Sequence, residues 1–302
     1  MKTIQDALTE YVETPEFKIK ITKEKTRRQY TYKLDRLAAL PFDGKEFGAF
    51  PLDQLKVATC QKVYWKLLES AKGKGIRFAN YTLQILTRAW NVLIRYDLLE
   101  KNPWSFVERS KEPARNTVWN NEDFIVLLNT AFKRKGWRNV GLLVRINVEL
   151  GQRIEDIRMA TWKNFKLNKK LYVREVIQKT GERIPGIPIS DNLIEMLKEQ
   201  YEIFGFQEWV VPSPVTLEPY TEESIRKIFA RIRKAAGLPS VLQLRDIRRT
   251  VLTDLANCGA TDTEIMSYSG HKSRESLNPY IRITTEQARN AAAKRNFTLA
   301  KY

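Results

Sequence analysis

Apolar side chains recur at helical spacing through the first third of the chain. The pattern covers the segments 25–40, 54–75 and 80–104. The last of them carries two adjacent apolar stripes, made of Ile85, Ala89, Val92 and Tyr96 and of Leu86, Trp90 and Leu93. Apolar residues three and four positions apart lie on one face of an α-helix. The pattern therefore predicts a helical bundle, with these side chains in its core and Cys60 buried as a small hydrophobic residue.

A polar, charged segment without periodicity follows the helical part. It reads VERSKEPARNTVWNNEDF and is typical of a linker. Asn121 then suits the N-cap of a new helix, because Glu122 and Asp123 would lie in its first turn. We place the domain boundary near residue 113. We expect a helical domain at 1–107, a linker at 108–118, a second domain at 119–285 and a tail at 286–302.

The second domain combines helical and β-prone patterns. The segments KLYVREVIQ and RIPGIPIS flank KTGE and predict an antiparallel hairpin, with Pro185 and Pro188 on an edge strand. Helical runs surround it, including one that is broken at Gly151 and one that is capped by Thr221. The predicted fold is mostly α, with a helical front domain and an α-rich second domain that holds a small antiparallel sheet.

The charge of the chain narrows the choice of partner. Its 302 residues include 52 Lys and Arg against 35 Asp and Glu, which gives a net charge of +17 and a pI near 9.8. Such a surplus favours a polyanion as partner, and nucleic acid fits best because its phosphates can be neutralised by these side chains. An anionic membrane surface is the weaker alternative, and a merely basic soluble enzyme stays open.

Other classes of protein are disfavoured by composition. No apolar run approaches the roughly 18–20 residues that span a bilayer, and the amino terminus lacks the apolar core of a signal peptide. With Cys60 and Cys258 as its two cysteines and a single histidine, the chain suits neither a disulfide scaffold nor a tetrahedral zinc site. We expect a cytoplasmic protein.

Two groups of arginines stand out as candidate anion ligands. Arg245 and Arg248 lie three positions apart in QLRDIRRTVL, which predicts that they share a helical face. They form either a solvated basic turn or a site where two guanidinium groups converge on one phosphate. Arg153 begins another probable helix, and Asp156 lies where it can hold the Arg153 side chain. Such a pair alone is common on protein surfaces.

The single histidine, His271, lies in SYSGHKSRESLNPY, nine positions before Tyr280. Histidine is the side chain whose unperturbed pKa is nearest neutrality, so a lone histidine can serve chemistry. By itself, however, His271 is equally well a residue that caps the helix before it. Tyr280, taken alone, is most simply a tyrosine packed in the core.

Together these motifs resemble the tyrosine recombinase family, the phage-integrase type of site-specific recombinase. GQRIEDIRMATW is similar to the family's first box, and QKTGERIPGIPIS to its β-hairpin lysine segment. LRDIRRTVLTDLANCGATDTEIMSYSGHKSRESLNPYI resembles the second box, in which a tyrosine follows Leu-Gly-His. Order and spacing match across roughly 145–285, and the helical front resembles the family's core-binding domain.

The resemblance implies a role for six residues. Carried over one by one, Tyr280 is the nucleophile, Arg153 and Arg248 clamp the scissile phosphate, Lys179 is the general acid, His271 is a further phosphate ligand and Asp156 orients Arg153. Arg245 departs from the family, which usually has His and sometimes Lys at its position. Arginine binds phosphate but accepts no proton near neutral pH. Our hypothesis is that Arg245 is a third phosphate ligand.

The resemblance also implies an activity and partners. The chain would cut and rejoin double-stranded DNA at specific recombination sites through a 3′-phosphotyrosine, without metal, cofactor or ATP. It would act as a homo-tetramer, with accessory DNA-bending proteins as further partners. Its location would be the nucleoid of a bacterial or phage-infected cell. The tail 286–302 would dock on a neighbouring protomer or pack in cis. The additional amino-terminal domain of many integrases is not expected. The alternatives are a type IB topoisomerase-like enzyme that relaxes DNA and a catalytically impaired relative that only binds DNA.

Overall fold

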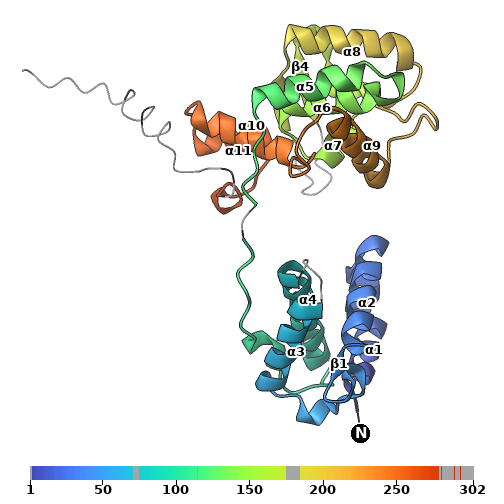
Figure 1. Cartoon of the computed structure of the whole chain (residues 1–302), viewed down its shortest axis with the longest axis vertical. Helices are drawn as coiled ribbons and strands as arrows, with labels where there is room; N and C mark the ends of the chain where they lie inside the picture. The colour runs from blue at the N-terminus through green and yellow to red at the C-terminus, as the bar shows by residue number, and fades with distance from the viewer. Residues whose placement is uncertain are drawn as a thin grey trace, which may run out of the picture. The chain divides into compact units, whose positions relative to one another are not determined.

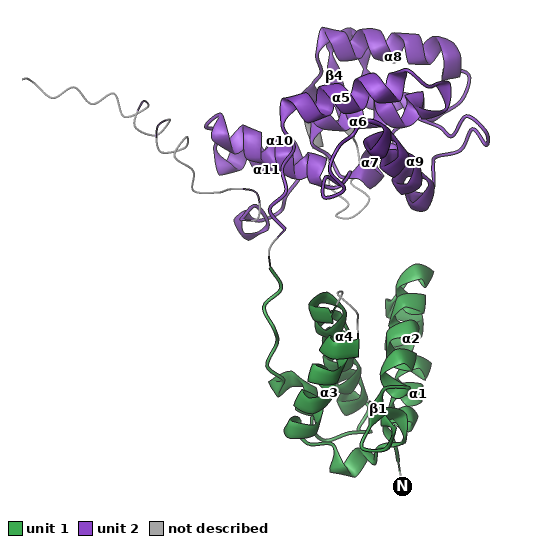
Figure 2. Ribbon diagram, viewed as in Figure 1, with its two compact units in different colours: residues 1–113 green, residues 114–302 purple. Residues whose placement is uncertain are grey.

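The chain folds into two compact units, Met1–Pro113 and Ala114–Tyr302 (Figure 2). The computed structural model describes residues 2–70, 75–113, 115–174, 184–278 and 280, together with 289 and 293. Each unit has its own hydrophobic core. The division falls inside the segment 108–118 that the sequence marks as a linker. None of the described helices combines the length and apolar character that crossing a membrane requires.

Unit 1 is a helical bundle with a small β-ribbon (Figure 1). Its α-helices are α1 (Ile4–Glu13), α2 (Glu24–Ala38), α3 (Val57–Ser70) and α4 (Gly75–Arg95). The ribbon pairs β1 (Pro41–Phe42) with β2 (Lys45–Glu46) in antiparallel fashion. Single-turn helices of the 3-10 or π type cover Glu16–Lys20, Phe47–Ala49, Leu52–Gln54 and Pro103–Phe106. Helix α4 contacts α1, α2 and α3 and is therefore the centre of the bundle.

The core of unit 1 follows the predicted apolar stripes of α4, with two corrections. Leu86 and Trp90 are buried, and the Trp90 ring packs edge-on against Trp104 with ring centroids 5.7 Å apart. Tyr96, which we predicted on the same stripe, is 41% exposed because α4 already ends at Arg95. Its hydroxyl instead donates a hydrogen bond to Glu16 at 2.5 Å. Val57, which belongs to the apolar pattern predicted over 54–75, is exposed as well, because it is the first residue of α3.

Unit 2 is built around α6 (Arg138–Leu150). This helix contacts α5 (Asn121–Phe132), α7 (Ile154–Arg158), α8 (Asp191–Phe204), α9 (Glu222–Ala235) and α10 (Asp246–Asn257), and α10 in turn contacts α11 (Asp262–Ser269). Single 3-10 turns cover Lys135–Trp137, Trp162–Asn164, Leu167–Lys169 and Arg274–Ser276. The helix α5 begins as predicted, except that its N-cap is Asn120, whose side chain accepts from the amide of Asp123 at 2.7 Å.

The sheet of unit 2 has three antiparallel strands in the order β3-β4-β5. They are β3 (Phe165–Lys166), β4 (Leu171–Arg174) and β5 (Ile184–Pro188). The predicted hairpin supplies β4 and β5, and β5 lies at the edge, where its two prolines do not interrupt a second ladder. The two-residue strand β3 was not predicted. Mostly helical units with small antiparallel sheets confirm the predicted fold class.

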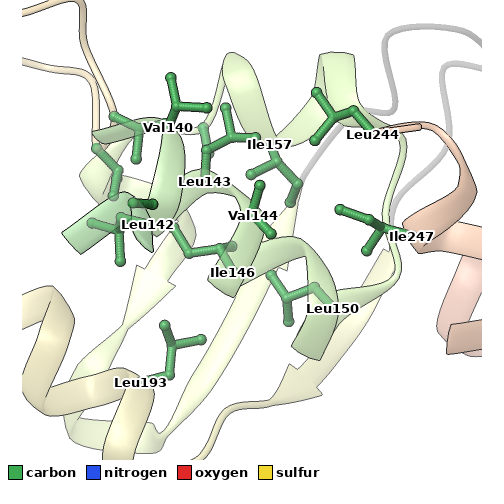
Figure 3. Close-up of a cluster of buried hydrophobic side chains, with 14 of the residues drawn as sticks. Val140, Leu142, Leu143, Val144, Ile146, Leu150, Ile157, Leu193, Leu244 and Ile247 are labelled. Atoms are coloured by element: carbon green, nitrogen blue, oxygen red, sulfur yellow. The ribbon is translucent and has the colours of Figure 1, made fainter. Parts of the chain in front are cut away.

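The core of unit 2 anchors the helices that carry the candidate site residues (Figure 3). Side chains of α6, among them Leu143 and Ile146, pack there with Ile157 of α7 and Ile247 of α10, and these four side chains are fully buried. Burying a side chain of this size contributes about 1.5–3 kcal/mol. Helices α7 and α10 are therefore fixed to one common core.

The segment between the two units is bonded at both of its ends. On the unit 1 side, the amide of Ser110 donates to the Tyr64 hydroxyl at 2.8 Å, and the Asn80 side chain donates to the Ser110 carbonyl at 3.0 Å. On the unit 2 side, Arg115 forms a bidentate ion pair with Asp246 in the first turn of α10, through Nε at 2.7 Å and Nη2 at 2.6 Å. These bonds raise the pKa of Arg115.

Replacing Arg115 with alanine is expected to destabilise α10, because the Asp246 side chain is only 2% exposed and would be left as an unpaired buried carboxylate. Removing one partner of a buried pair costs about 3 kcal/mol. Hydrogen exchange of the α10 amides should therefore become about 100-fold faster. Arg138→Ala is the control, since its partner Glu199 is exposed and the loss should stay below about 1 kcal/mol. Equal exchange in the two variants would contradict the role of this ion pair.

Candidate active site

A left-handed turn at Gly151 starts the candidate site. Gly151 ends α6 with φ 57°, and a Cβ at this position would come within 2.7 Å of the Val251 side chain on α10. Glycine is required here for both reasons, since other residues adopt positive φ at a cost and bring the Cβ with them. The turn places Arg153 at the N-cap of α7, next to α10.

Arg248 is the buried centre of the site. Its side chain is on α10, and the residue is only 7% exposed. Nη1 donates to the carbonyl of Gly151 at 3.2 Å, and Nη2 donates to the carbonyl of Ser269 at 3.0 Å and lies 3.2 Å from Nε2 of His271. One guanidinium group thus connects the end of α6, the end of α11 and the segment that follows α11.

The surroundings of Arg248 both lower and raise its pKa. Burial, followed by the nearby charge of Arg153, lowers its pKa to about 10, whereas the Tyr280 side chain and the carboxylate of Asp156 act to raise the pKa. The guanidinium group nevertheless remains charged at neutral pH. Two cations close together in a partly buried site favour the binding of an anion.

Arg153 presents a donor that is not used within the described part of the chain. Its Nη1 atom is buried and has no hydrogen-bond partner among those residues. Asp156, three positions on, is 1% exposed, and its amide donates to the Arg153 carbonyl at 2.8 Å. A buried donor without a partner is costly, so a ligand that accepts this hydrogen bond would relieve the cost.

His271 follows the left-handed C-cap of α11. Gly270 has φ 68° at this cap, and the chain then leaves the helix so that the imidazole meets Arg248. Nδ1 of His271 lies 2.6 Å from the Ser269 hydroxyl oxygen. Burial, with the charges of Arg248 and Arg153, lowers the pKa of His271 to about 4. The imidazole is therefore neutral at pH 7.

Tyr280 completes the cluster from the same chain. Its side chain interacts electrostatically with Arg248, and its ring centroid lies 5.3 Å from that of His271. The guanidinium carbon of Arg249 is 5.3 Å from the centre of the Tyr280 ring. The backbone is held by Thr253, whose hydroxyl donates to the Tyr280 carbonyl at 3.2 Å. Tyr280 therefore lies in one cluster with His271 and Arg249.

Arg245 has different surroundings from Arg248. It occupies the N-cap position of α10 and is exposed. It lines a cavity of about 430 Å³ together with Glu155 and Arg158, which form an ion pair with each other. The predicted pair of arginines on one face is thus divided between this cavity and the buried site.

Two predicted features lie outside the described residues. Lys179 falls in the gap 175–183, and the tail 286–302 is described only at 289 and 293. Within the described ranges, no three His, Cys, Asp or Glu side chains are grouped to hold a metal ion.

Comparison with known proteins adds a family and two relatives. The model of the phage integrase family matches residues 121–287. The integrase/recombinase y4qK of Sinorhizobium fredii is 23% identical over 120 residues, which are 40% of this chain and 39% of that protein. The tyrosine recombinase XerC of Listeria monocytogenes is 21% identical over 283 residues, which cover 87% of this chain and 92% of that protein.

Solved integrase structures share the fold of the chain. A lambda integrase dimer bound to a COC′ core site matches 99% of this chain and 80% of its own, with a TM-score of 0.72 and 20% identity. A Tn1549 transposon integrase in complex with transposon right end DNA matches 97% of this chain and 99% of its own, with a TM-score of 0.75 and 18% identity. At these identities the likeness establishes the fold and leaves the roles of individual residues to the geometry of the site.

Proposed function

This chain belongs to the phage integrase family of tyrosine recombinases, and we propose that it performs site-specific recombination through Tyr280. The observation that carries the proposal is the clustering of Tyr280 with His271, whose ring centroids lie 5.3 Å apart, beside the buried cation Arg248, whose Nη2 lies 3.2 Å from Nε2 of His271. The Tyr280 oxygen attacks a DNA phosphodiester, and the chain becomes covalently attached to the 3′ phosphate. The family assignment itself confirms what the sequence motifs predicted.

The chemistry explains why cations surround the phenol. Attack on a phosphodiester concentrates negative charge on the non-bridging oxygens, and fixed cations stabilise this charge more in the transition state than before it. Arg153 and Arg248 suit the task, because guanidinium groups stay charged and present planar forks to a phosphate. The unused Nη1 donor of Arg153 supports a phosphate ligand at this place. We assign Asp156 the role of orienting Arg153.

The leaving group needs a proton, which we assign to Lys179. The departing 5′ oxygen is poor at leaving as an anion, and an ammonium group can protonate it. Strand β5, which follows the gap that contains Lys179, contacts α11, and α11 ends next to His271. The 3′-phosphotyrosine is itself a phosphate ester, so the energy of the broken bond to the 5′ oxygen is conserved. The 5′ hydroxyl can therefore attack the 3′-phosphotyrosine and rejoin the strand without ATP.

We extend the proposal to partners. One similar structure, with a TM-score of 0.72 at 20% identity, is a lambda integrase tetramer bound to a Holliday junction. We propose that this chain likewise binds double-stranded DNA at specific sites and acts as a homo-tetramer, with accessory DNA-bending proteins as further partners. The tail 286–302 would dock on a neighbouring protomer, with packing in cis as the alternative.

Trapping the covalent intermediate tests the proposed function. DNA fragments that the chain retains are first sequenced to find its site, and a nicked version of this site is then incubated with the protein. We expect a detergent-resistant adduct at a 3′ phosphate and recombination between two such sites. If the protein forms the adduct and relaxes supercoiled DNA but does not recombine two sites, the topoisomerase-like alternative is favoured. DNA binding without any adduct would favour the catalytically impaired one.

Arg245→His tests whether position 245 can handle the phenolic proton. Arginine stays protonated there, so we propose it as a third phosphate ligand. Histidine has an unperturbed pKa near 6.5, and the variant should gain a rise in cleavage rate as pH increases through about 6.5, which the unmodified chain lacks. Rates of adduct formation from pH 5 to 9 measure this. An unchanged pH profile would argue against a base at position 245.

A further inference from the structure

The hydroxyl of Ser269 determines where the proton of His271 lies. Ser269 is the last residue of α11 and is fully buried. Its oxygen lies 2.6 Å from the carbonyl oxygen of Ile265 and 2.6 Å from Nδ1 of His271. A carbonyl only accepts, so the single hydroxyl proton goes to Ile265. The serine oxygen is left as an acceptor, and Nδ1 must carry a hydrogen to bond to it.

Arg248 lies against the face of the same ring. Its Nη2 atom lies 3.2 Å from Nε2 of His271 and 3.4 Å from Nδ1, so it is almost equidistant from the two ring nitrogens. A donor in line with the Nε2 lone pair, which lies in the ring plane and points away from Nδ1, would be much farther from Nδ1. The guanidinium group therefore stacks on the imidazole and leaves this lone pair uncovered. Ser269 selects the neutral form of the imidazole, and Arg248 does not compete for its Nε2 lone pair.

We propose that Ser269 is a positioning residue that holds His271 protonated on Nδ1, so that Nε2 is free to accept the phenolic proton of Tyr280. The inference rests on the proposed function. It makes His271 the proton acceptor, a role that Arg245 cannot fill because arginine stays protonated. It also changes the role that the family resemblance implies for His271. A ring with a lone pair on Nε2 cannot donate to a phosphate from that atom until it has taken up a proton there.

The proton transfer can be written with all atoms accounted for. A bound phosphate offsets the charges of Arg153 and Arg248, so Nε2 becomes more basic. The O–H bond of Tyr280 breaks, an N–H bond forms at Nε2, and the phenolate oxygen bonds to phosphorus as the bond to the 5′ oxygen breaks. That oxygen takes a proton from Lys179. The imidazolium N–H can then bind a phosphoryl oxygen.

The single histidine makes the tautomer directly measurable. Nitrogen-15 NMR of the imidazole in the full chain, without DNA at pH 7, reports one residue. We expect the signals of a protonated Nδ1 and an unprotonated Nε2. Ser269→Ala should mix the two tautomers, and Ser269→Thr, which keeps the hydroxyl, should restore one. Ser276→Ala is the control, because the Ser276 hydroxyl also donates to a carbonyl at 2.6 Å, that of Ser273.

The outcomes separate this inference from the proposed function. A protonated Nε2 in the unmodified chain, which needs no variant to fold, would overturn it, as would an unchanged spectrum in Ser269→Ala. With the DNA site in hand, Ser269→Ala should form the adduct about 10-fold more slowly, since proton transfer to a positioned group contributes 10²-fold or more. A shifted tautomer with an unchanged adduct rate would overturn the acceptor role of His271 and leave Tyr280 as nucleophile intact.

Discussion

Tyr280→Phe should abolish the covalent protein–DNA adduct while DNA affinity stays within about twofold. The substitution removes one oxygen, the atom that would bond to phosphorus. The phenylalanine ring can keep the contacts of the tyrosine ring with His271 and Arg249. Loss of the interaction of the hydroxyl with the charged Arg248 side chain changes stability by at most about 1.5–3 kcal/mol. Adduct yield on denaturing gels and affinity at one fixed salt concentration measure the two effects.

Tyr268→Phe provides the matched control for this experiment. The Tyr268 hydroxyl donates to the carbonyl of Glu149, and burial raises the pKa of Tyr268 to about 12. Its role is thus structural, and the variant should lose about 1 kcal/mol of stability and still form the adduct. An adduct that persists in Tyr280→Phe would show that another residue is the nucleophile.

Arg248→Ala should slow adduct formation by about 10³-fold, because it removes a cation that stabilises the transition state. The same change leaves the carbonyls of Gly151 and Ser269 without their donor. Each unsatisfied buried group costs about 1–3 kcal/mol, so the melting temperature should fall as well. Rates are therefore compared at a temperature where circular dichroism shows the variant to be folded.

Arg248→Lys separates charge from geometry. Lysine supplies a positive charge but cannot bond to two carbonyls and a phosphate with one planar fork. We expect it to recover less than about tenfold of the lost rate. Full recovery by lysine would mean that charge alone matters at position 248 and that the connection between α6 and α11 is incidental.

The sequence predicts the elements of the fold well where periodicity and capping agree. The turn at Gly151 and the caps of α9 and α11 follow from short local patterns, and short-range rules describe such features. The predicted helix extended to Asn102-Pro103, past the end of α4 at Arg95, because an apolar stripe does not mark where a helix stops. Strand β3 is too short for any alternation to show.

The site was less predictable, because much of it depends on contacts across long stretches of chain. Ser269 looked like an ordinary helix-terminal serine, and the one signal was that it stands where the family motif has leucine before Gly-His. The ion pair of Arg115 with Asp246 joins residues 131 positions apart, and no local rule indicates it. Arg245 was placed with Arg248 by spacing alone, although α10 begins only after Arg245.

The bonded ends of the segment between the units limit how far apart the two halves can act. Five positions separate Ser110, bonded within unit 1, from Arg115, bonded within unit 2. An extended chain covers at most about 3.6 Å per residue, so the span is at most about 18 Å. Under the proposed function, binding of one half to a duplex would present the other half at an effective concentration of about millimolar order, because the tether is short. Two individually weak contacts would then bind as one strong contact, because the chain dissociates only when both halves are unbound at the same time.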